Sequence, residues 1–208
     1  MNLIGGYMKP YFILYFIIPV LLTSFFYRSD SDSNYLIDKK VYEYKNFYIE
    51  YPIIRGYEKK LIQNNVNQSF EFLISKYSDD LFYSNMNIYF EINKRNRNIL
   101  SVVFRGKGRL KNKKYVEILD SVNFDMFKTG KVINYSNFIK DDLIVRKIIL
   151  NRMYEQFGID DLKTNNIEFY FKDDNIIFYF KLFDDFYKDY LEVSVPLSEL
   201  SLHLDYDF

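Results

Sequence analysis

The sequence predicts an α+β fold, in which antiparallel sheet is covered by two main helices and preceded by one N-terminal transmembrane or signal helix. Three observations support this fold class: an uncharged run near the N-terminus, several stretches in which apolar and polar residues alternate, and two stretches with helical apolar spacing. The strand patterns outnumber the helical ones, which favours sheets over a helical bundle.

The uncharged run covers residues 10–27, the short limit for a helix that crosses a bilayer. An uncleaved anchor and a cleavable signal peptide both stay open, and the bulky residues at the end of the run, which give no A-x-A-like cleavage site, favour the anchor. Residues 1–28 are therefore interpreted as a signal-anchor or signal peptide, 29–40 as a linker, and 41–208 as the folded domain. We expect a single-pass protein of the cell membrane with that domain outside, or alternatively a secreted protein.

Alternation predicts the strands of the domain, and turn residues separate them. One strand is expected over Val41–Pro52, where the proline ends it. The remaining elements are two paired strands over 84–96 and 98–108, a strand over 114–127, a tight turn at 128–131, an aromatic hairpin over 166–183 and a last strand with a terminal turn over 190–200.

Helical spacing predicts two amphipathic helices, over 57–77 and 138–158. Gly158 is a suitable stop for the second helix. The stripe expected to be buried is Leu61, Ile62, Val66, Phe70, Leu73 and Ile74 in the first helix, and Leu143, Ile144, Ile148, Ile149, Met153 and Phe157 in the second.

The residue content disfavours an enzyme and predicts no cofactor and no metal. The chain has no Cys, which excludes disulfides, thiolate metal sites and a Cys nucleophile, and its single His disfavours a histidine metal site or a Ser-His-Asp triad. The carboxylate pairs lack the alternate spacing and central Gly of a calcium loop, so structural roles are expected for Asp79–Asp80, Asp141–Asp142 and Asp160–Asp161.

Charge is unevenly distributed, although the formal net charge is +0. Residues 94–114 hold nine basic residues and no acidic one. In a strand every second side chain lies on one face, so this segment predicts a cationic stripe. The stripe either protects an exposed edge or contacts a polyanion, meaning phospholipid headgroups or an anionic envelope polymer, and nucleic acid is disfavoured by the export segment. Its residues are Arg105, Lys107, Arg109, Lys111 and Lys113.

Several stretches, in order over about residues 41 to 202, resemble the RsiV/PdaC-type extracellular domain family. Tyr48–Phe70 resembles its opening, a strand with Tyr-Pro-x-Ile that leads through Gly into a helix with an Asn-x-x-Ile/Val-Asn pattern. Asn98–Gly106 resembles its central strand and Val122–Ile133 its Phe-Asp…Thr-Gly-Lys hairpin. Phe169–Phe186 and Val193–Leu200 resemble its closing hairpin and end.

The resemblance implies a Firmicute cell-envelope module similar to the lysozyme-binding ectodomain of an anti-sigma factor, or to accessory domains of peptidoglycan deacetylases. The chain departs from the family in having no cytoplasmic sigma-binding part and no deacetylase domain. Arg105–Tyr115 replaces the family's Gly-Gly-Ala-His motif, and Asp184–Tyr190 replaces an Ala-Pro-Tyr-Ala loop.

These expectations define three functional hypotheses. The first is an envelope binding or sensor-like module whose partner is an envelope protein, an anionic polymer or a lysozyme-like protein. Because lysozymes are strongly cationic, such a partner would contact an acidic region instead of the stripe. That region is Asp173, Asp174, Asp184, Asp185 and Asp189. The alternatives are a hydrolase or accessory protein acting on cell-wall polymer, which would need two carboxylates facing across a cleft, and a structural partner of another membrane protein.

Overall fold

The computed structural model describes residues 34–162, 164, 166–181 and 190–206. The predicted membrane segment at residues 10–27 and residues 29–33 of the predicted linker lie outside these ranges. Among the described helices, none is both long and apolar enough to cross a membrane. Within the described residues, the first strand begins at Leu36, inside the segment 29–40 that was expected to be a linker.

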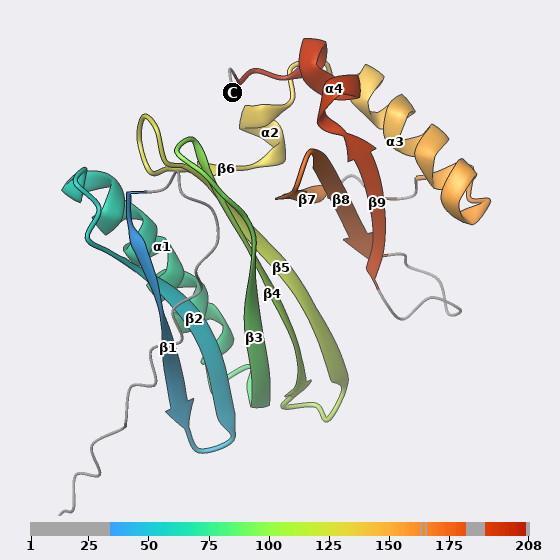
Figure 1. Cartoon of the computed structure of the whole chain (residues 1–208). Coiled ribbons are helices and arrows are strands. Elements are labelled where there is room, and N and C mark those ends of the chain that lie inside the picture. The colour runs from blue at the N-terminus through green and yellow to red at the C-terminus, as the bar shows by residue number, and fades with distance from the viewer. Residues whose placement is uncertain (1–33, 163, 165, 182–189, 207–208) are drawn as a thin grey trace, which may run out of the picture.

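In the described part of the chain, two sheets and two long helices make up the fold (Figure 1). The elements of the six-stranded sheet are β1 (Leu36–Tyr44), β2 (Phe47–Arg55), β3 (Tyr83–Arg95), β4 (Ile99–Leu110), β5 (Tyr115–Asp125) and β6 (Val132–Ile133), with α1 (Lys60–Tyr77) between β2 and β3. The remaining elements are α2 (Tyr135–Phe138), α3 (Asp142–Phe157), the three-stranded sheet of β7 (Glu168–Lys172), β8 (Asn175–Lys181) and β9 (Tyr190–Pro196), α4 (Leu197–Leu200) and the 3₁₀ turn η1 (Ser201–His203).

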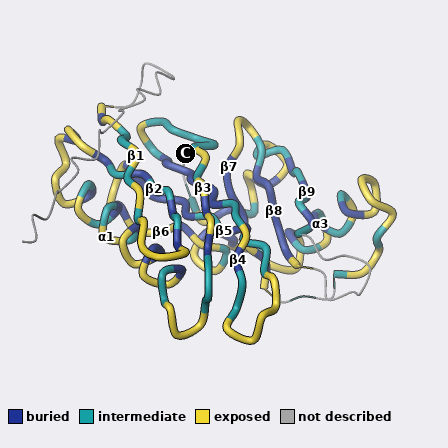
Figure 2. Tube along the Cα trace, turned by 90° about the horizontal axis from the view of Figure 1, so that it is seen from below, coloured by how far each residue is buried: buried dark blue, intermediate teal, exposed yellow. Residues whose placement is uncertain are grey.

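The elements form four layers, in the order α1, six-stranded sheet, three-stranded sheet and α3. Figures 1 and 2 show α1 and α3 on opposite outer sides, and Figure 2 shows the buried segments of the chain between them. Three buried apolar clusters correspond to the three contacts between layers. The predicted α+β class with two main helices is therefore confirmed, whereas the sheet is not purely antiparallel.

The strand expected over Val41–Pro52 is wrong, because the chain turns in the middle of it. β1 and β2 form an antiparallel hairpin around Lys45, which has a positive φ of 53°, and Asn46. Pro52 lies inside β2. Residues two apart in a strand direct their N–H groups to the same side, and the Ile54 N–H donates to a helix side chain, away from β1. The missing N–H of Pro52 therefore removes no bond from the hairpin ladder.

β2 and β3 are parallel, which makes the six-stranded sheet mixed. The two strands are joined through α1, a crossover of the kind that parallel neighbours require. Their pairing covers only Phe47–Ile49 of β2. Further along β2, the side chain of Asn67 on α1 makes the backbone hydrogen bonds that a neighbouring strand would otherwise make. The Ile54 N–H donates to Asn67 Oδ1 at 2.8 Å, and Asn67 Nδ2 donates to the Ile54 carbonyl at 3.0 Å.

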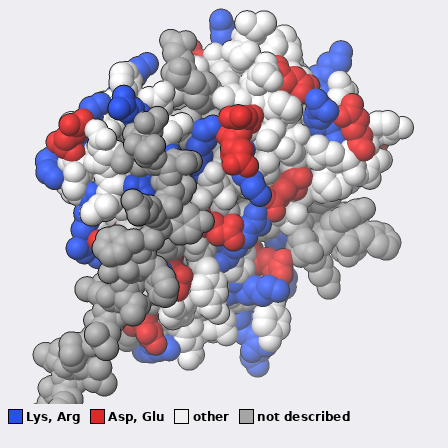
Figure 3. Space-filling model, viewed as in Figure 1, with Lys and Arg blue, Asp and Glu red and all other residues white. Residues whose placement is uncertain are grey.

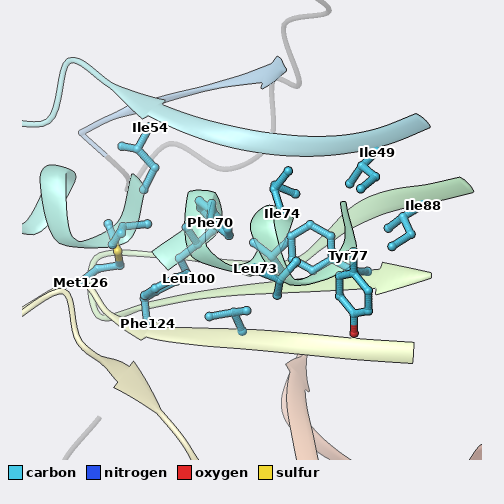
Figure 4. Close-up of a cluster of buried hydrophobic side chains, with 14 of the residues drawn as sticks. Ile49, Ile54, Phe70, Leu73, Ile74, Tyr77, Ile88, Leu100, Phe124 and Met126 are labelled. Atoms are coloured by element: carbon cyan, nitrogen blue, oxygen red, sulfur yellow. The ribbon is translucent and has the colours of Figure 1, made fainter. Parts of the chain in front are cut away.

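The helix α1 buries one face on the six-stranded sheet (Figure 4). Val66 and Phe70 are fully buried, and the Phe70 ring makes edge contacts with Phe104 and Phe124 from β4 and β5. The predicted stripe is confirmed except for Leu61, which is 74% exposed. Removing a ring such as Phe70 from this core costs about 3–5 kcal/mol.

The loop between β5 and β6 is ordered by one carboxylate and lies against the start of α1 at one glycine. Asp125 accepts hydrogen bonds from the Phe127 and Lys128 N–H groups and the Thr129 hydroxyl. Gly130 has a φ of +67°, as expected for the tight turn at 128–131, and a Cβ there would lie 2.9 Å from Ile62. The Phe-Asp…Thr-Gly-Lys stretch of the sequence is thus the part of the chain that docks this loop on the helix.

The helix α3 covers the outer face of the three-stranded sheet with a narrower stripe than expected. Val145, Ile149 and Met153 are buried, whereas Leu143 is 83% exposed and Ile144 and Phe157 are also exposed. The prediction of the stripe is therefore wrong at these three positions. Apolar residues occur on more than one side of this helix, so periodicity alone did not select the buried face. The stop at Gly158 is confirmed, with a φ of +70°.

Candidate functional site

The cationic stripe divides into two parts in the structure. Arg105, Lys107 and Arg109 alternate along β4 and share the face that is turned toward the three-stranded sheet, as the strand pattern predicts. Lys111 and Lys113 lie beyond the end of β4, in its turn to β5. The five residues do not form one free surface, because the strand residues have partners.

Arg105 is committed to the other sheet. Its Nη1 and Nη2 donate to the two carboxylate oxygens of Glu192 on β9 at 2.9 and 2.8 Å, and the Tyr170 hydroxyl donates to the same carboxylate. Burial alone would raise the pKa of Glu192, but the hydrogen bonds from Arg105 and Tyr170 outweigh it and lower that pKa. The hydrogen bond with Glu192 likewise raises the pKa of Arg105. This bidentate ion pair links the two sheets. A ligand could bind either side chain only by breaking the pair.

Lys107 and Arg109 have cross-strand neighbours on β5. Lys107 Nζ lies 3.1 Å from Glu117 Oε1, its partner in the register of β4 and β5. Arg109 pairs with Tyr115 in the same register, and its guanidinium lies 4.5 Å from the centre of the tyrosine ring. The Lys107 pair is exposed and contributes little to stability, but it offsets the charge of one stripe residue.

A groove of about 510 Å³ runs between these strands and β9. Both of its carboxylates, Glu117 and Glu192, are paired with stripe cations. The rest of the lining is mostly polar or aromatic, and it includes Asn87, Tyr89 and Tyr190. The groove thus has nearly balanced charge, unlike the polyanion site that the stripe predicts.

Above the groove, buried polar groups fix the two sheets to each other. Ser101 Oγ donates to Asn123 Oδ1 at 2.7 Å and accepts from the Phe171 N–H at 3.0 Å, while Asn123 Nδ2 donates to the Phe169 carbonyl at 2.8 Å. Ser101 and Asn123 are nearly inaccessible to solvent, so these bonds satisfy groups that would otherwise be costly to bury. The buried polar groups between the two sheets are therefore already used by the fold.

Lys111 and Lys113, for which the described part of the chain offers no carboxylate partner, lie at one end of the six-stranded sheet, where three connections meet. Asn46 in the β1–β2 turn accepts from the Met86 N–H, and Phe82 between α1 and β3 accepts from the Lys111 N–H. Figure 1 shows the β1–β2 turn, the start of β3 and the β4–β5 turn at this lower end. We call it the hairpin end and define it as Tyr44, Lys45, Asp79, Asp80, Leu81, Phe82, Arg109, Lys111, Lys113, Lys114 and Tyr115.

The hairpin end carries an excess of basic and apolar side chains. Its five basic residues exceed its two aspartates by three charges. Lys111, Lys113 and Lys114 are exposed, and Lys45 lies 3.7 Å from Asp80. Figure 3 shows Lys and Arg side chains at this lower end beside uncharged ones. The stripe predicted Arg109, Lys111 and Lys113 of this surface. It missed Lys45, Lys114 and the apolar members, because they come from connections whose meeting point no local pattern specifies.

The acidic region is only partly described. Asp173 and Asp174 form the turn between β7 and β8, while Asp184, Asp185 and Asp189 lie outside the described residues. The described neighbours of that segment, Lys181 and Tyr190, pair with each other at the opposite end of β8 from this turn. Contact with a lysozyme-like partner through this region stays a prediction.

Two of the three carboxylate pairs that the sequence assigned to structure, Asp79–Asp80 and Asp141–Asp142, have partners within the fold. Asp79 Oδ1 accepts from the Leu81 N–H, and Asp141 Oδ2 lies 3.1 Å from His203 Nδ1. Asp142 begins α3, where its charge suits the helix dipole. In the described ranges, no three His, Asp or Glu residues are grouped so as to hold a metal ion.

Comparison with known proteins shows similarity at the level of structure. No family model matches the sequence, and no curated protein does. A DUF3298 family protein from Bacteroides fragilis NCTC 9343 superposes with a TM-score of 0.58 at 12% identity, covering 83% of this chain and 92% of the other. A DUF3298 family protein from Pseudomonas aeruginosa PAO1 gives a TM-score of 0.47 at 8% identity, covering 82% and 93%. The chain therefore shares the fold of the Bacteroides DUF3298 family protein.

Proposed function

We propose that this chain is a non-catalytic binding module of the cell envelope that contacts an anionic partner through the hairpin end. The observation that carries the proposal is the cluster of Lys111, Lys113 and Lys114, three exposed cations on one hairpin turn. Arg105 and Lys107, the other strong candidates, already have carboxylate partners. The apolar run at residues 10–27 supports a location at the outer face of the membrane.

The carboxylates of the groove do not suit a glycosidase-type hydrolase. A glycosidase-type hydrolase needs one carboxyl group that stays protonated near neutral pH. In the groove, the pKa of Glu192 is lowered by its hydrogen bonds with Arg105 and Tyr170, despite the opposing effect of burial, and Glu117 is paired with Lys107. A second cavity is lined by two further carboxylates, Glu168 and Asp120. Asp120 accepts hydrogen bonds from Tyr77 and Lys76, so this carboxylate is already engaged by the fold.

The proposal is tested by sedimentation of the full chain, kept in mild detergent, with two anionic probes. These are wall sacculi that retain their anionic polymer and vesicles that contain phosphatidylglycerol. The variant Lys111→Gln/Lys113→Gln/Lys114→Gln should lose most of the bound fraction. The control Lys60→Gln/Lys140→Gln/Lys147→Gln removes the same charge from exposed positions elsewhere and should retain it.

Binding to either probe should weaken as salt rises, since exposed charges are screened. Equal binding by both triple variants would overturn the role of the hairpin end. Absence of binding to both probes at low salt would overturn the proposal itself.

A further inference from the structure

We propose that the anionic partner of the hairpin end is a lipid bilayer, into whose headgroup region Leu81 and Phe82 insert. This inference rests on the proposed function and specifies its partner. Leu81 is 78% exposed and Phe82 is 66% exposed, and the two are adjacent at the tip of the α1–β3 connection. Contact with a hydrated polymer gives no reason for two large apolar side chains to project into solvent, whereas partition into a membrane interface does.

The loop that presents these side chains is already ordered by its own hydrogen bonds. Asp79 Oδ1 accepts from the Leu81 N–H at 2.8 Å, and the Asp79 carbonyl accepts from the Tyr83 N–H at 3.1 Å. The Phe82 carbonyl accepts from the Lys111 N–H at 2.9 Å, which ties the apolar tip to the basic turn. Docking would therefore require little further ordering of the chain, and that preorganisation favours binding.

Basic and aromatic residues flank the apolar tip on both sides. Tyr44 is 49% exposed, and Lys45 Nζ lies 4.7 Å from the centre of its ring. Tyr115 is 76% exposed beneath the guanidinium of Arg109. Tyrosine is enriched at the level of lipid headgroups, which long lysine side chains also reach. Asp79 and Asp80 would be repelled by an anionic surface. The basic residues of the hairpin end outnumber them, and Lys45 pairs with Asp80.

Chain length permits the predicted anchor and the hairpin end to meet the same bilayer. β1 runs from Leu36 to Tyr44 at the hairpin end, which is about 27 Å at 3.4 Å per residue. The chain advances nine residues from Tyr27, the last residue of the apolar run, to Leu36, and that stretch can span at most about 30 Å. The chain after Tyr27 is therefore long enough for the anchor and the hairpin end to meet the same bilayer.

The sequence allows a clean probe of this contact, because the chain contains no Trp. Phe82→Trp places a single indole in the tip, which is excited selectively over the tyrosines, and Tyr154→Trp places one at a similarly exposed position on α3, where Tyr154 is 63% exposed. Each full-length variant is reconstituted in nanodiscs that contain phosphatidylglycerol and lipids brominated in the acyl chain. Fluorescence of the tip probe should shift to shorter wavelength and be quenched, while the α3 probe should keep the emission of a water-exposed indole.

The charge dependence is measured in the Phe82→Trp background. Each Lys near an anionic surface strengthens partition about fivefold, so replacing Lys111, Lys113 and Lys114 by Gln should weaken docking about 100-fold and abolish most of the quenching. The Lys60/Lys140/Lys147 control should keep it. Far-ultraviolet circular dichroism confirms that each variant is folded.

Two outcomes would overturn the bilayer proposal: no quenching of the tip probe, or equal quenching of both probes. If the tip probe is not quenched while the chain still binds polymer-bearing sacculi through the hairpin-end lysines, the partner is the polymer and the proposed function stands. If the chain binds neither the sacculi nor the lipid, both proposals fail.

Discussion

The guanidinium of Arg105 donates hydrogen bonds to both carboxylate oxygens of Glu192, a residue 87 positions later in the chain. The pair joins β4 of the six-stranded sheet to β9 of the three-stranded sheet, at the upper edge of the groove. Both side chains are partly buried, and the Tyr170 hydroxyl donates to the same carboxylate. The stripe residue with the strongest contact therefore serves the junction of the sheets.

Breaking this pair should destabilise the fold without weakening the hairpin end. Arg105→Gln leaves the Glu192 carboxylate partly buried without its cation, and we expect a loss of about 1–3 kcal/mol in the free energy of unfolding. Urea unfolding of the full chain in mild detergent measures it. Lys107→Gln, which breaks an exposed pair, should change stability by no more than about 0.5 kcal/mol. Equal effects of the two substitutions would contradict a special role for Arg105.

The same pair predicts a pH dependence. The pKa of Glu192 in the folded state is lowered from its ordinary value of 4.5 by hydrogen bonds with Arg105 and Tyr170, which outweigh burial. A carboxyl group with a lowered folded-state pKa adds stability above its unfolded pKa and loses it as the pH falls through the folded one. The stability difference between wild type and Arg105→Gln should therefore be full at pH 6 and shrink below about pH 4.5.

Asp125 should be the second acid-sensitive group of the fold. Burial would raise its pKa, but bonds from the Lys128 N–H, the hydroxyls of Tyr206 and Thr129 and the Phe127 N–H lower it below 3.8. Asp125→Asn should cost about 1–3 kcal/mol in unfolding free energy at pH 7, because an amide cannot accept from all four donors. The loss should diminish as the pH falls below about 3.8. The exposed Asp205→Asn is the control, and an equally large effect there would contradict the assignment.

Sequence patterns located most elements, because their information is local. Alternation placed the hairpin of β3 and β4, and the turn signal placed Gly130. The β1–β2 hairpin was missed because Lys45, a non-glycine residue with positive φ, makes its turn. The parallel pairing of β2 with β3 depends on a crossover through α1, which no strand pattern encodes.

The candidate site was predictable only in part for the same reason. Strand periodicity correctly placed Arg105, Lys107 and Arg109 on one face. It gave no sign that Glu192 would lie against Arg105, because that contact depends on how two sheets pack. The apolar tip at Leu81 and Phe82 belongs to no periodic pattern. It could not be recognised as part of a site because the basic hairpin turns next to it come from other parts of the sequence.

The amide of Asn67 should be worth more to stability than its partly exposed position suggests. It both accepts from and donates to the backbone of Ile54, at 2.8 and 3.0 Å, and so completes the open side of β2. Asn67→Asp keeps the acceptor but sets a carboxylate against the Ile54 carbonyl, so we expect a loss of about 1–3 kcal/mol in unfolding free energy. Asn64→Asp on the exposed side of α1 is the matched control. Similar losses at both positions would show that charge on the helix, not the Ile54 contact, is responsible.

Gly130 and Gly158 allow backbone strain to be separated from steric contact. Their φ values are +67° and +70°, so a side chain meets a similar backbone penalty at each, about 1–2 kcal/mol. A Cβ at Gly130 would lie 2.9 Å from the Cα and carbonyl oxygen of Ile62, whereas no described atom beyond the chain neighbours lies within 4 Å of one at Gly158. Gly130→Ala should therefore lower the free energy of unfolding by at least about 1 kcal/mol more than Gly158→Ala, since the loop must move off α1. Urea unfolding of the two variants gives this difference directly, and equal losses would mean that the loop yields freely and that contact with Ile62 does not hold it on the helix.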